Sequence, residues 1–193
     1  VAEDGSLRVS QRAWLSCVAG GSLRWSTRLA RRPSEPPTSD PLVLRDGTTL
    51  LTVGNQVLGV DADGRVILSQ AVRLSLDDSG SAPNVDATGA LLLTAITGEV
   101  ARWVRGRAEV LGRFGWDIVA PAIYEDGSLA VAVYSGTGLC RVAADGKILW
   151  RTELGDPDLL PTINAAQVVA VGSLIRGSAF FGPSGRALGR YPL

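Results

Sequence analysis

Apolar residues in this chain occur in short continuous runs that alternate with polar turns. Representative runs are residues 49–53 (Thr-Leu-Leu-Thr-Val), 130–134 (Ala-Val-Ala-Val-Tyr) and 168–171 (Val-Val-Ala-Val). Each run is short and rich in β-branched residues, which is typical of a strand covered on both faces. No segment has the length and period of an amphipathic helix. The pattern therefore predicts an all-β protein.

The runs and turns recur five times with a period of roughly 40 residues. Two landmarks keep the register: an acidic turn after the first strand of each copy and a glycine turn after the third. They fall at Asp4-Gly5, Asp46-Gly47, Asp86, Asp126-Gly127 and, in altered form, Asn164-Ala165, and at Gly21, Gly64, Gly106, Gly146 and Gly185; copies two to five open on Pro41, Pro83, Pro121 and Pro161. Since glycine adopts positive φ without steric cost, we expect the Asp-Gly pairs to form two-residue hairpin turns.

A period near 40 with four strand-like segments predicts the blades of a β-propeller. We expect about five four-stranded blades within one propeller segment, 1–193, spanning approximately residues 1–30, 41–76, 83–113, 121–155 and 161–193. Copy one has only three residues before its turn aspartate, so we expect its first strand to be cut short. Because edge strands must be satisfied, we expect a larger seven- or eight-bladed ring, completed by further blades or another chain. A five-bladed ring and an open assembly are the alternatives.

Composition narrows the classes of partner. The chain has 46% hydrophobic residues, a formal net charge of zero and 19 basic residues scattered along the sequence. Phosphate binding needs a concentrated basic surface, so we expect no nucleic-acid partner. The apolar runs are much shorter than the ~18 to 20 residues of a membrane span, so we expect a chain that does not span a membrane.

Two stretches carry a resemblance to a known family. Residues 139–150 read Leu-Cys-Arg-Val-Ala-Ala-Asp-Gly-Lys-Ile-Leu-Trp, and residues 57–68 are a second copy in which Leu68 takes the place of the final tryptophan. The pattern resembles the tryptophan-docking repeat of the pyrroloquinoline-quinone (PQQ)-like β-propellers. Trp25 and Trp150 keep the docking tryptophan. The resemblance implies that these two indoles pack between blades, where they bury a large apolar area.

PQQ-like propellers include quinoprotein dehydrogenases and cofactor-free scaffolds of the BamB type, and this chain resembles the scaffolds. The dehydrogenases carry a vicinal cysteine pair beside the quinone, with Glu, Asn and Asp around Ca²⁺. In this chain Cys17 and Cys140 are three repeats apart, and we expect both to be free and buried. The chain also has no histidine, the usual base of nucleophilic catalysis. We therefore expect no catalytic residues, no cofactor and no metal.

Propeller geometry indicates where a partner would bind. Loops that join a fourth strand to the next first strand share one face with those that join strands two and three, and loops carry function more often than the framework. On this loop face, Trp116 and Asp117 are the best contact candidates, because exposed tryptophan is enriched at interface hot spots. Arg31 and Arg32 lead into a proline-rich stretch and would suit an acidic partner surface. Packing of Trp116 over a blade junction and a solvated strand end at Arg31 are the structural alternatives.

The sequence thus predicts a non-catalytic protein–protein interaction scaffold. The family resemblance implies a bacterial, extracytoplasmic location: the periplasm, the outer membrane or the cell surface. The alternative function is an enzyme, either a PQQ-dependent oxidoreductase or a carbohydrate-active propeller.

Overall fold

The computed structural model describes residues 2–29, 39–76, 83–86, 88–95, 97–104, 107–115, 118, 120–133, 138–154, 160–173 and 177–192. Within these residues the chain forms nineteen β-strands and no helix. It divides into two compact units, Val1–Pro83 and Asn84–Leu193.

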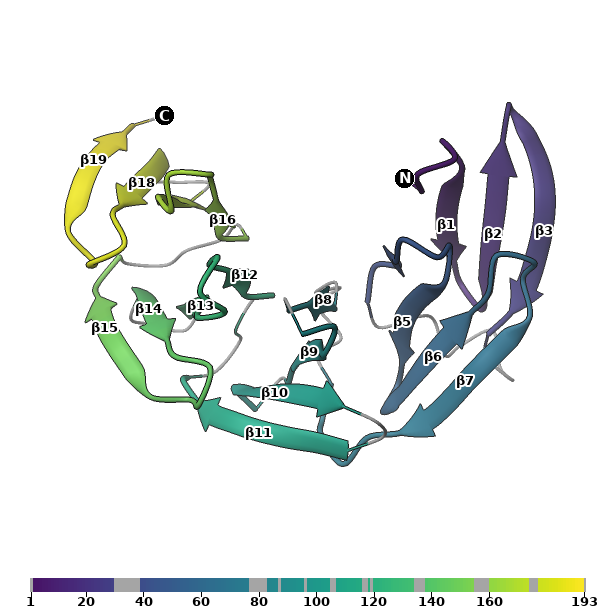
Figure 1. Ribbon diagram of the computed structural model, residues 1–193, viewed down its shortest axis with the longest axis horizontal. Coiled ribbons are helices and arrows are strands. Elements are labelled where there is room, and N and C mark those ends of the chain that lie inside the picture. The colour runs from purple at the N-terminus through teal and green to yellow at the C-terminus, as the bar shows by residue number, and fades with distance from the viewer. Residues whose placement is uncertain are drawn as a thin grey trace. The chain divides into compact units, whose positions relative to one another are not determined.

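The strands assemble into five antiparallel sheets, numbered 1 to 5 in chain order, each with its strands in sequence order (Figure 1). In the first unit, sheet 1 contains β1 (Leu7–Gln11), β2 (Trp14–Ala19) and β3 (Ser22–Arg28), and sheet 2 contains β4 (Leu42–Val43), β5 (Thr49–Val53), β6 (Gln56–Val60) and β7 (Val66–Ala71). In the second unit, sheet 3 contains β8 (Asn84–Val85), β9 (Leu91–Thr94), β10 (Glu99–Val104) and β11 (Arg107–Arg113), sheet 4 contains β12 (Ala122–Ile123), β13 (Leu129–Val133), β14 (Gly138–Val142) and β15 (Ile148–Thr152), and sheet 5 contains β16 (Thr162–Ile163), β17 (Val169–Ser173), β18 (Gly177–Phe181) and β19 (Ala187–Tyr191).

Burial follows strand position within each sheet. The second strands β5, β9 and β13 are buried almost throughout, which confirms strands covered on both faces. The fourth strands are largely exposed, and in the second unit β11, β15 and β19 lie along one side of the unit (Figure 1). The first strands have only two residues each and follow the prolines that open copies two to five.

The turns after the first strands differ from the two-residue hairpins expected. In sheet 4 the Tyr124 N–H donates to Ser128 O (2.8 Å) and the Gly127 N–H to Tyr124 O (2.9 Å), which closes a loop of three residues. A two-residue type I′ turn needs positive φ at both central positions, whereas only Gly127, at φ 80°, adopts it in this loop. Asp126 instead accepts the Ser128 N–H with Oδ1 (3.0 Å), an Asx-type contact that stabilises the loop.

Two of the acidic landmarks were also assigned to the wrong place in this loop. The hydrogen bonds place Asp86 and Asn164 at the position of Tyr124, so that Gly89 and Gln167 correspond to Gly127. Gln167 adopts φ 60° where the other copies have glycine. Asn164 Oδ1 accepts the N–H groups of Ala166 and Val168 (3.0 Å each) and so replaces the missing turn aspartate.

The glycine turn after the third strand takes two forms. Asp61 and Arg65 enclose a three-residue loop that ends in Gly64, and the same loop recurs before Gly146 and Gly185. In sheet 1, Gly20 and Gly21 instead form a two-residue turn, with φ of 57° and 75°. A β-bulge at Cys17/Val18 or at the corresponding position precedes this turn in sheets 1, 2, 4 and 5.

Tryptophan docks one sheet onto the next in both units, as the resemblance implied. Trp25 Nε1 donates to Ala62 O of sheet 2 (2.6 Å), and a Cβ at Gly64 would lie 2.7 Å from the indole. Trp150 Nε1 likewise donates to Pro183 O of sheet 5 (2.8 Å), over Gly185. Each indole therefore needs a glycine in the turn that it covers.

The seam between sheets 3 and 4 uses other residues for the same purpose. Arg102 Nη1 donates to Ala144 O (3.4 Å), and the backbone of Leu111 closes onto Gly146, where a Cβ would lie 1.9 Å from Leu111 O. In each of the three seams, the acceptor is thus the carbonyl two residues before the turn glycine.

Candidate functional site

The contact residues predicted from sequence, Arg31, Arg32, Trp116 and Asp117, all lie outside the described residues. Their role as a binding site stays a prediction. The described residues of the first unit form two pockets along the seam between sheets 1 and 2, one near each end.

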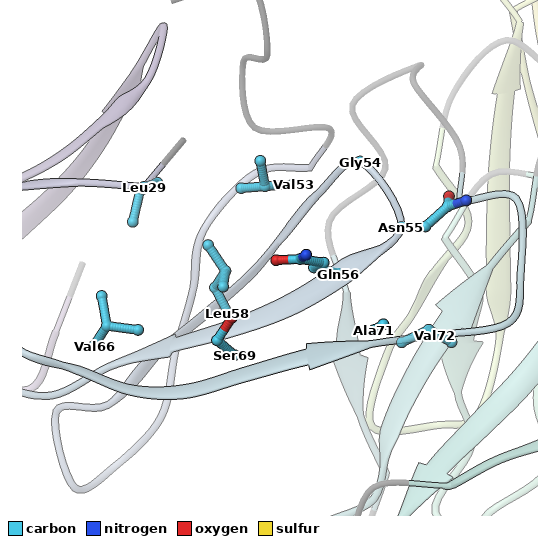
Figure 2. A pocket seen from close by; sticks show the side chains of 10 residues that line it. All are labelled: Leu29, Val53, Gly54, Asn55, Gln56, Leu58, Val66, Ser69, Ala71 and Val72. Carbon is cyan, nitrogen blue, oxygen red and sulfur yellow. The ribbon is translucent and has the colours of Figure 1, made fainter. Parts of the chain in front are cut away.

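The first pocket has a volume of about 710 Å³ and lies where β5 turns into β6. We call it the amide pocket. Its apolar lining includes Leu29, Val53, Leu58 and Val72, and its polar lining includes Asn55 and Gln56. Figure 2 shows Val53, Gln56 and Leu58 extending from sheet 2 toward Leu29 of sheet 1. This turn belongs to the loop face that the sequence assigned to binding.

The base of the amide pocket is held by packing and hydrogen bonds, and its described lining residues are uncharged. Leu58 belongs to the hydrophobic core between the two sheets, and Leu29 and Val53 pack against that core. The Val72 N–H donates to Asn55 O (2.8 Å), and the Leu76 N–H donates to Asn55 Oδ1 (3.4 Å), so the turn is held from its own sheet. Such a lining can hold an apolar group beside two amides, but it offers no acid or base.

The second pocket, of about 600 Å³, lies at the opposite end of the seam, among the three-residue loops. We call it the arginine pocket. Its charged lining includes Arg8, Arg24, Arg45, Asp4, Asp46 and Asp63. Arg8 Nη1 donates to Ser6 Oγ (2.6 Å) and to Cys17 Sγ (2.8 Å), and the guanidinium carbon lies 5.1 Å from the centroid of the Trp25 ring. Trp25 thus contributes both to the seam and to this pocket.

Proton chemistry near neutral pH has little support in the described residues. Hydrogen bonds from Ser6 lower the pKa of Asp4, and those from Ser128 lower the pKa of Asp126, with Arg141 adding to the effect. Burial alone would raise the pKa of Asp86, but hydrogen bonds from Thr88 and Ala90 and the Arg102 charge outweigh it, so this pKa is also lowered.

Burial has the opposite effect on two other groups. It raises the pKa of the Cys140 thiol to about 11 and that of Tyr124 above its ordinary range. Both groups are therefore neutral at pH 7. None of these five shifts brings a pKa toward neutrality, where a general acid or base works best.

The described residues do not fit a PQQ–Ca²⁺ site. Within this part of the chain, no three His, Cys, Asp or Glu side chains are grouped closely enough to hold a metal ion. Cys17 and Cys140 are both free and buried, as predicted, and lie in different units of the chain. A vicinal cysteine pair is thus missing from the sequence itself.

Sequence reasoning missed most of both pockets. Trp25 was singled out for docking, but Arg8, Gln56 and Leu58 were not. Leu29 and Leu58 are far apart in sequence and meet only because sheet 1 packs on sheet 2. The signal in the sequence that could have found the amide pocket is the expectation that loops joining second and third strands lie on the binding face. The turn Gly54–Asn55 is such a loop.

A scan against protein-family models finds no match, and a search of curated proteins finds none either. Solved structures do match over the whole chain. A catalytically inactive histidine-to-alanine variant of virginiamycin B lyase from Staphylococcus aureus, solved with quinupristin, is similar with a TM-score of 0.80 at 13% identity, over 100% of this chain and 68% of that one. BamB from Moraxella catarrhalis matches with a TM-score of 0.74 at 12% identity, over 100% of this chain and 63% of that one.

A third similar structure is BBS1N, solved in complex with ARL6DN, with a TM-score of 0.73 at 13% identity, over 97% of this chain and 61% of that one. This chain has the β-propeller fold. It spans about two thirds of the length of the propeller chains that it matches. None of the described residues belongs to a helix with the length and hydrophobicity of a membrane span.

Proposed function

We propose that this chain is a non-catalytic propeller module that binds a protein partner through its loop face, with the amide pocket as the central contact. The observation that carries the proposal is that the described lining of that pocket is uncharged, with Leu29, Val53 and Leu58 beside the amides of Asn55 and Gln56. An apolar partner side chain would bury its surface against the leucines and valine. The two amides would bond to its main chain, as polar groups at the edge of an apolar pocket commonly do.

Two comparisons support a binding role over a catalytic one. BBS1N is a propeller solved with a protein partner. The virginiamycin B lyase variant is inactive after loss of a histidine, and this chain contains no histidine. Activities of the matched proteins belong to those proteins, and the fold hosts many unrelated functions.

A peptide-display selection on the chain tests this function. We expect selected peptides to share an apolar residue and to lose at least about tenfold in affinity against Gln56→Arg, because a guanidinium at the rim would have to be desolvated. Gln56 is exposed, so the fold should tolerate this change. The matched control is Arg45→Gln at the other end of the seam, which should bind normally. Equal loss in both variants would overturn the proposal.

An enzyme is the competing class, either a quinoprotein oxidoreductase or a carbohydrate-active propeller. Adding PQQ and Ca²⁺ and following dye-linked alcohol oxidation separates the quinoprotein from the scaffold. We expect neither a quinone absorbance bound to the protein nor turnover. Sustained turnover would overturn the assignment as a non-catalytic module.

We also propose that further blades, from the same polypeptide or another chain, cover the open face of sheet 1. On this face Leu7 and Val9 are each 45% exposed, whereas their counterparts in sheet 4, Leu129 and Val131, are fully buried. Cross-strand pairing puts Trp14 (46% exposed) and Leu23 (64%) on the same face.

Maleimide labelling tests this cover. A Val9→Cys variant should react quickly in this chain alone and slowly in the assembly that the full-length protein forms with any copurifying chain, whereas exposed Ser184→Cys should react quickly in both. Equal labelling of Val9→Cys in this chain and in that assembly would contradict the proposal.

The location is proposed on the family resemblance alone: a bacterial envelope, outside the cytoplasm. Fusion of the full-length protein to alkaline phosphatase, which is active only after export, should give phosphatase activity in cells. Activity of a cytoplasmic reporter fusion instead would overturn this location.

A further inference from the structure

Three arginines occupy related places in three of the sheets. Arg102 in β10 pairs with Leu92 of the neighbouring strand, and Arg141 in β14 pairs with Ala130. Arg8 lies one strand earlier in its sheet. It occupies in β1 the position that Ala130 occupies in sheet 4, and it pairs with Cys17. The guanidinium groups of sheets 1 and 4 reach the same kind of partner. Arg8 Nη1 donates to Ser6 Oγ (2.6 Å), and Arg141 Nε donates to the corresponding Ser128 Oγ (2.8 Å).

Arg102 and Arg141 each have a carboxylate supplied by their own sheet. Arg102 Nε lies 2.7 Å from Asp86 Oδ2, and Arg141 Nη2 donates to Asp126 Oδ2 (2.8 Å). Arg141 also donates from Nη1 to Pro183 O (2.6 Å) and lies over the Tyr124 ring at 4.0 Å. Both guanidinium groups are therefore neutralised within the sheet.

Arg8 lacks this partner. Within the described part of the chain, no carboxylate lies at ion-pair distance from it, although Asp4 occupies the position of Asp126. Asp4 Oδ1 accepts the Ser6 N–H (2.9 Å) instead. Arg8 Nε is buried and has no hydrogen-bond partner among the residues that the structure describes. A buried donor without a partner costs roughly 1–3 kcal/mol, so the site is incomplete as it stands.

The arginine pocket opens onto this guanidinium. The Trp25 ring lies beside Arg8, and the loops of both sheets form the rim. Among the rim carboxylates, Glu3 lies 3.7 Å from Arg45, and Asp46 Oδ1 accepts the Thr48 N–H (2.9 Å). Glu3 is thus engaged across the seam and Asp46 within its own loop, and the charge of Asp4 acts on Arg8 without forming an ion pair with it.

We propose that the arginine pocket is a binding site for a carboxylate group, which Arg8 holds in the way that Arg102 holds Asp86 and Arg141 holds Asp126. Charge-assisted hydrogen bonds from a guanidinium favour a carboxylate over a neutral oxygen. The carboxylate comes from a small organic acid or from an acidic side chain of a polypeptide. The site is separate from the amide pocket, so the test of carboxylate binding does not depend on the test of the proposed loop-face function.

The site is tested by adding carboxylate ligands to the whole chain and monitoring NMR chemical shifts. The two reporters are the Arg8 Nε–H and the Trp25 indole N–H. One arm uses acetate, and the other uses a capped Gly-Glu-Gly peptide. The neutral controls are acetamide and the Gly-Gln-Gly peptide. We expect saturable shifts of both reporters with at least one carboxylate and none with its neutral control. Tighter binding of the peptide than of acetate assigns a polypeptide source, and the reverse assigns a small acid.

Variants separate a specific site from general electrostatics. Arg8→Gln should weaken carboxylate binding by at least about tenfold, the loss expected for hydrogen bonds to a charged group. Arg8→Lys, which keeps the charge but not the fork of donors, should weaken it less. Arg73→Gln, at an exposed arginine that lines neither pocket, should leave binding nearly unchanged. Equal losses in Arg8→Gln and Arg73→Gln would overturn the proposal. Wild-type shifts that do not saturate and that chloride reproduces would also overturn it, and that outcome does not depend on the folding of any variant.

Discussion

The two pockets of the first unit lie at opposite ends of the same seam, yet their chemistry differs completely. Among the described residues, the amide pocket has no charged residue in its lining, whereas the arginine pocket is lined by three arginines and four carboxylates. Both use sheets 1 and 2. The four carboxylates come from the turns, whereas two of the three arginines, Arg8 and Arg24, belong to strands β1 and β3.

Turn chemistry explains the separation of charge. At one end, β5 and β6 join through the two-residue turn Gly54–Asn55, which needs no acidic side chain. At the other end the loops have three residues, and aspartates accept the N–H two residues later, as Asp46 does from Thr48 and Asp61 from Asp63. Because every such loop lies at the same end of its sheet, acids collect there. The described lining of the amide pocket, at the other end, contains no such acid.

The largest expected effect comes from removing the indole between the two pockets. Trp25→Ala should lower the free energy of unfolding by about 3 kcal/mol, since it deletes a large apolar contact and the hydrogen bond to Ala62 O. Both pockets should then lose their ligands. Urea denaturation followed by circular dichroism measures the first effect, and the two binding assays measure the second.

Trp150→Ala is the matched control, because it removes the equivalent indole from the second unit. It should destabilise the chain to a similar extent but leave both pockets intact. Unchanged binding at both pockets in Trp25→Ala would contradict the claim that the seam holds the two pockets in shape.

A second prediction contrasts a buried carboxylate with a rim carboxylate. Asp86, with a side chain 2% exposed, pairs with Arg102, so Asp86→Asn should cost about 2–3 kcal/mol at pH 7. Because the folded state lowers the pKa of Asp86, its contribution is complete above the ordinary carboxyl pKa of about 4 and is lost as pH falls through the lowered value. The gap between wild type and variant should close below about pH 4.

Stability curves measured from pH 7 to pH 2 check this dependence. Asp4→Asn, at a fully exposed rim carboxyl group, should change stability little across the same range. A stability gap for Asp86→Asn that widens in acid would contradict a lowered pKa at Asp86.

A smaller effect distinguishes the glycines of the seam from those of the loops. Gly64→Ala should cost about 2 kcal/mol, because the new Cβ would lie 2.7 Å from the Trp25 ring at a φ of +85°. Gly5→Ala, at φ +76° with nothing within 4 Å, should show only the strain of the left-handed backbone, about 1 kcal/mol. Thermal or urea unfolding compares the two, and equal losses would show that Trp25 yields to the added methyl group.

The repeated features of the fold could be predicted from the sequence. Buried second strands, proline before the first strands and docking by Trp25 and Trp150 were all predicted, because each repeats a local pattern that tertiary structure reuses. The hairpin turns were predicted wrongly. An Asp followed by Gly is compatible with a two-residue or a three-residue loop, and only the φ of the aspartate distinguishes them.

Asp86 and Asn164 show a second limit, since Asp or Asn three residues before the αL position looks in sequence like a displaced turn aspartate. The pockets show a third limit of prediction from sequence. Leu29, Gln56 and Leu58 carry no motif, and Arg8 differs from Arg141 in its strand and in having no ion-pair partner among the described residues. Such differences depend on how two sheets meet, and no local pattern records them. The contacts predicted at Trp116, Asp117, Arg31 and Arg32 remain open to the same binding assays.

The most direct test of the central claim is an NMR map of where a display-selected peptide binds. We expect the amide and methyl shifts to concentrate at Val53, Gln56 and Leu58, to leave Ser6 and Gly64 unaffected, and to disappear in Gln56→Arg. Shifts confined to the arginine-pocket end of the seam, with the amide pocket silent, would contradict the claim that this chain binds its partner through the loop face.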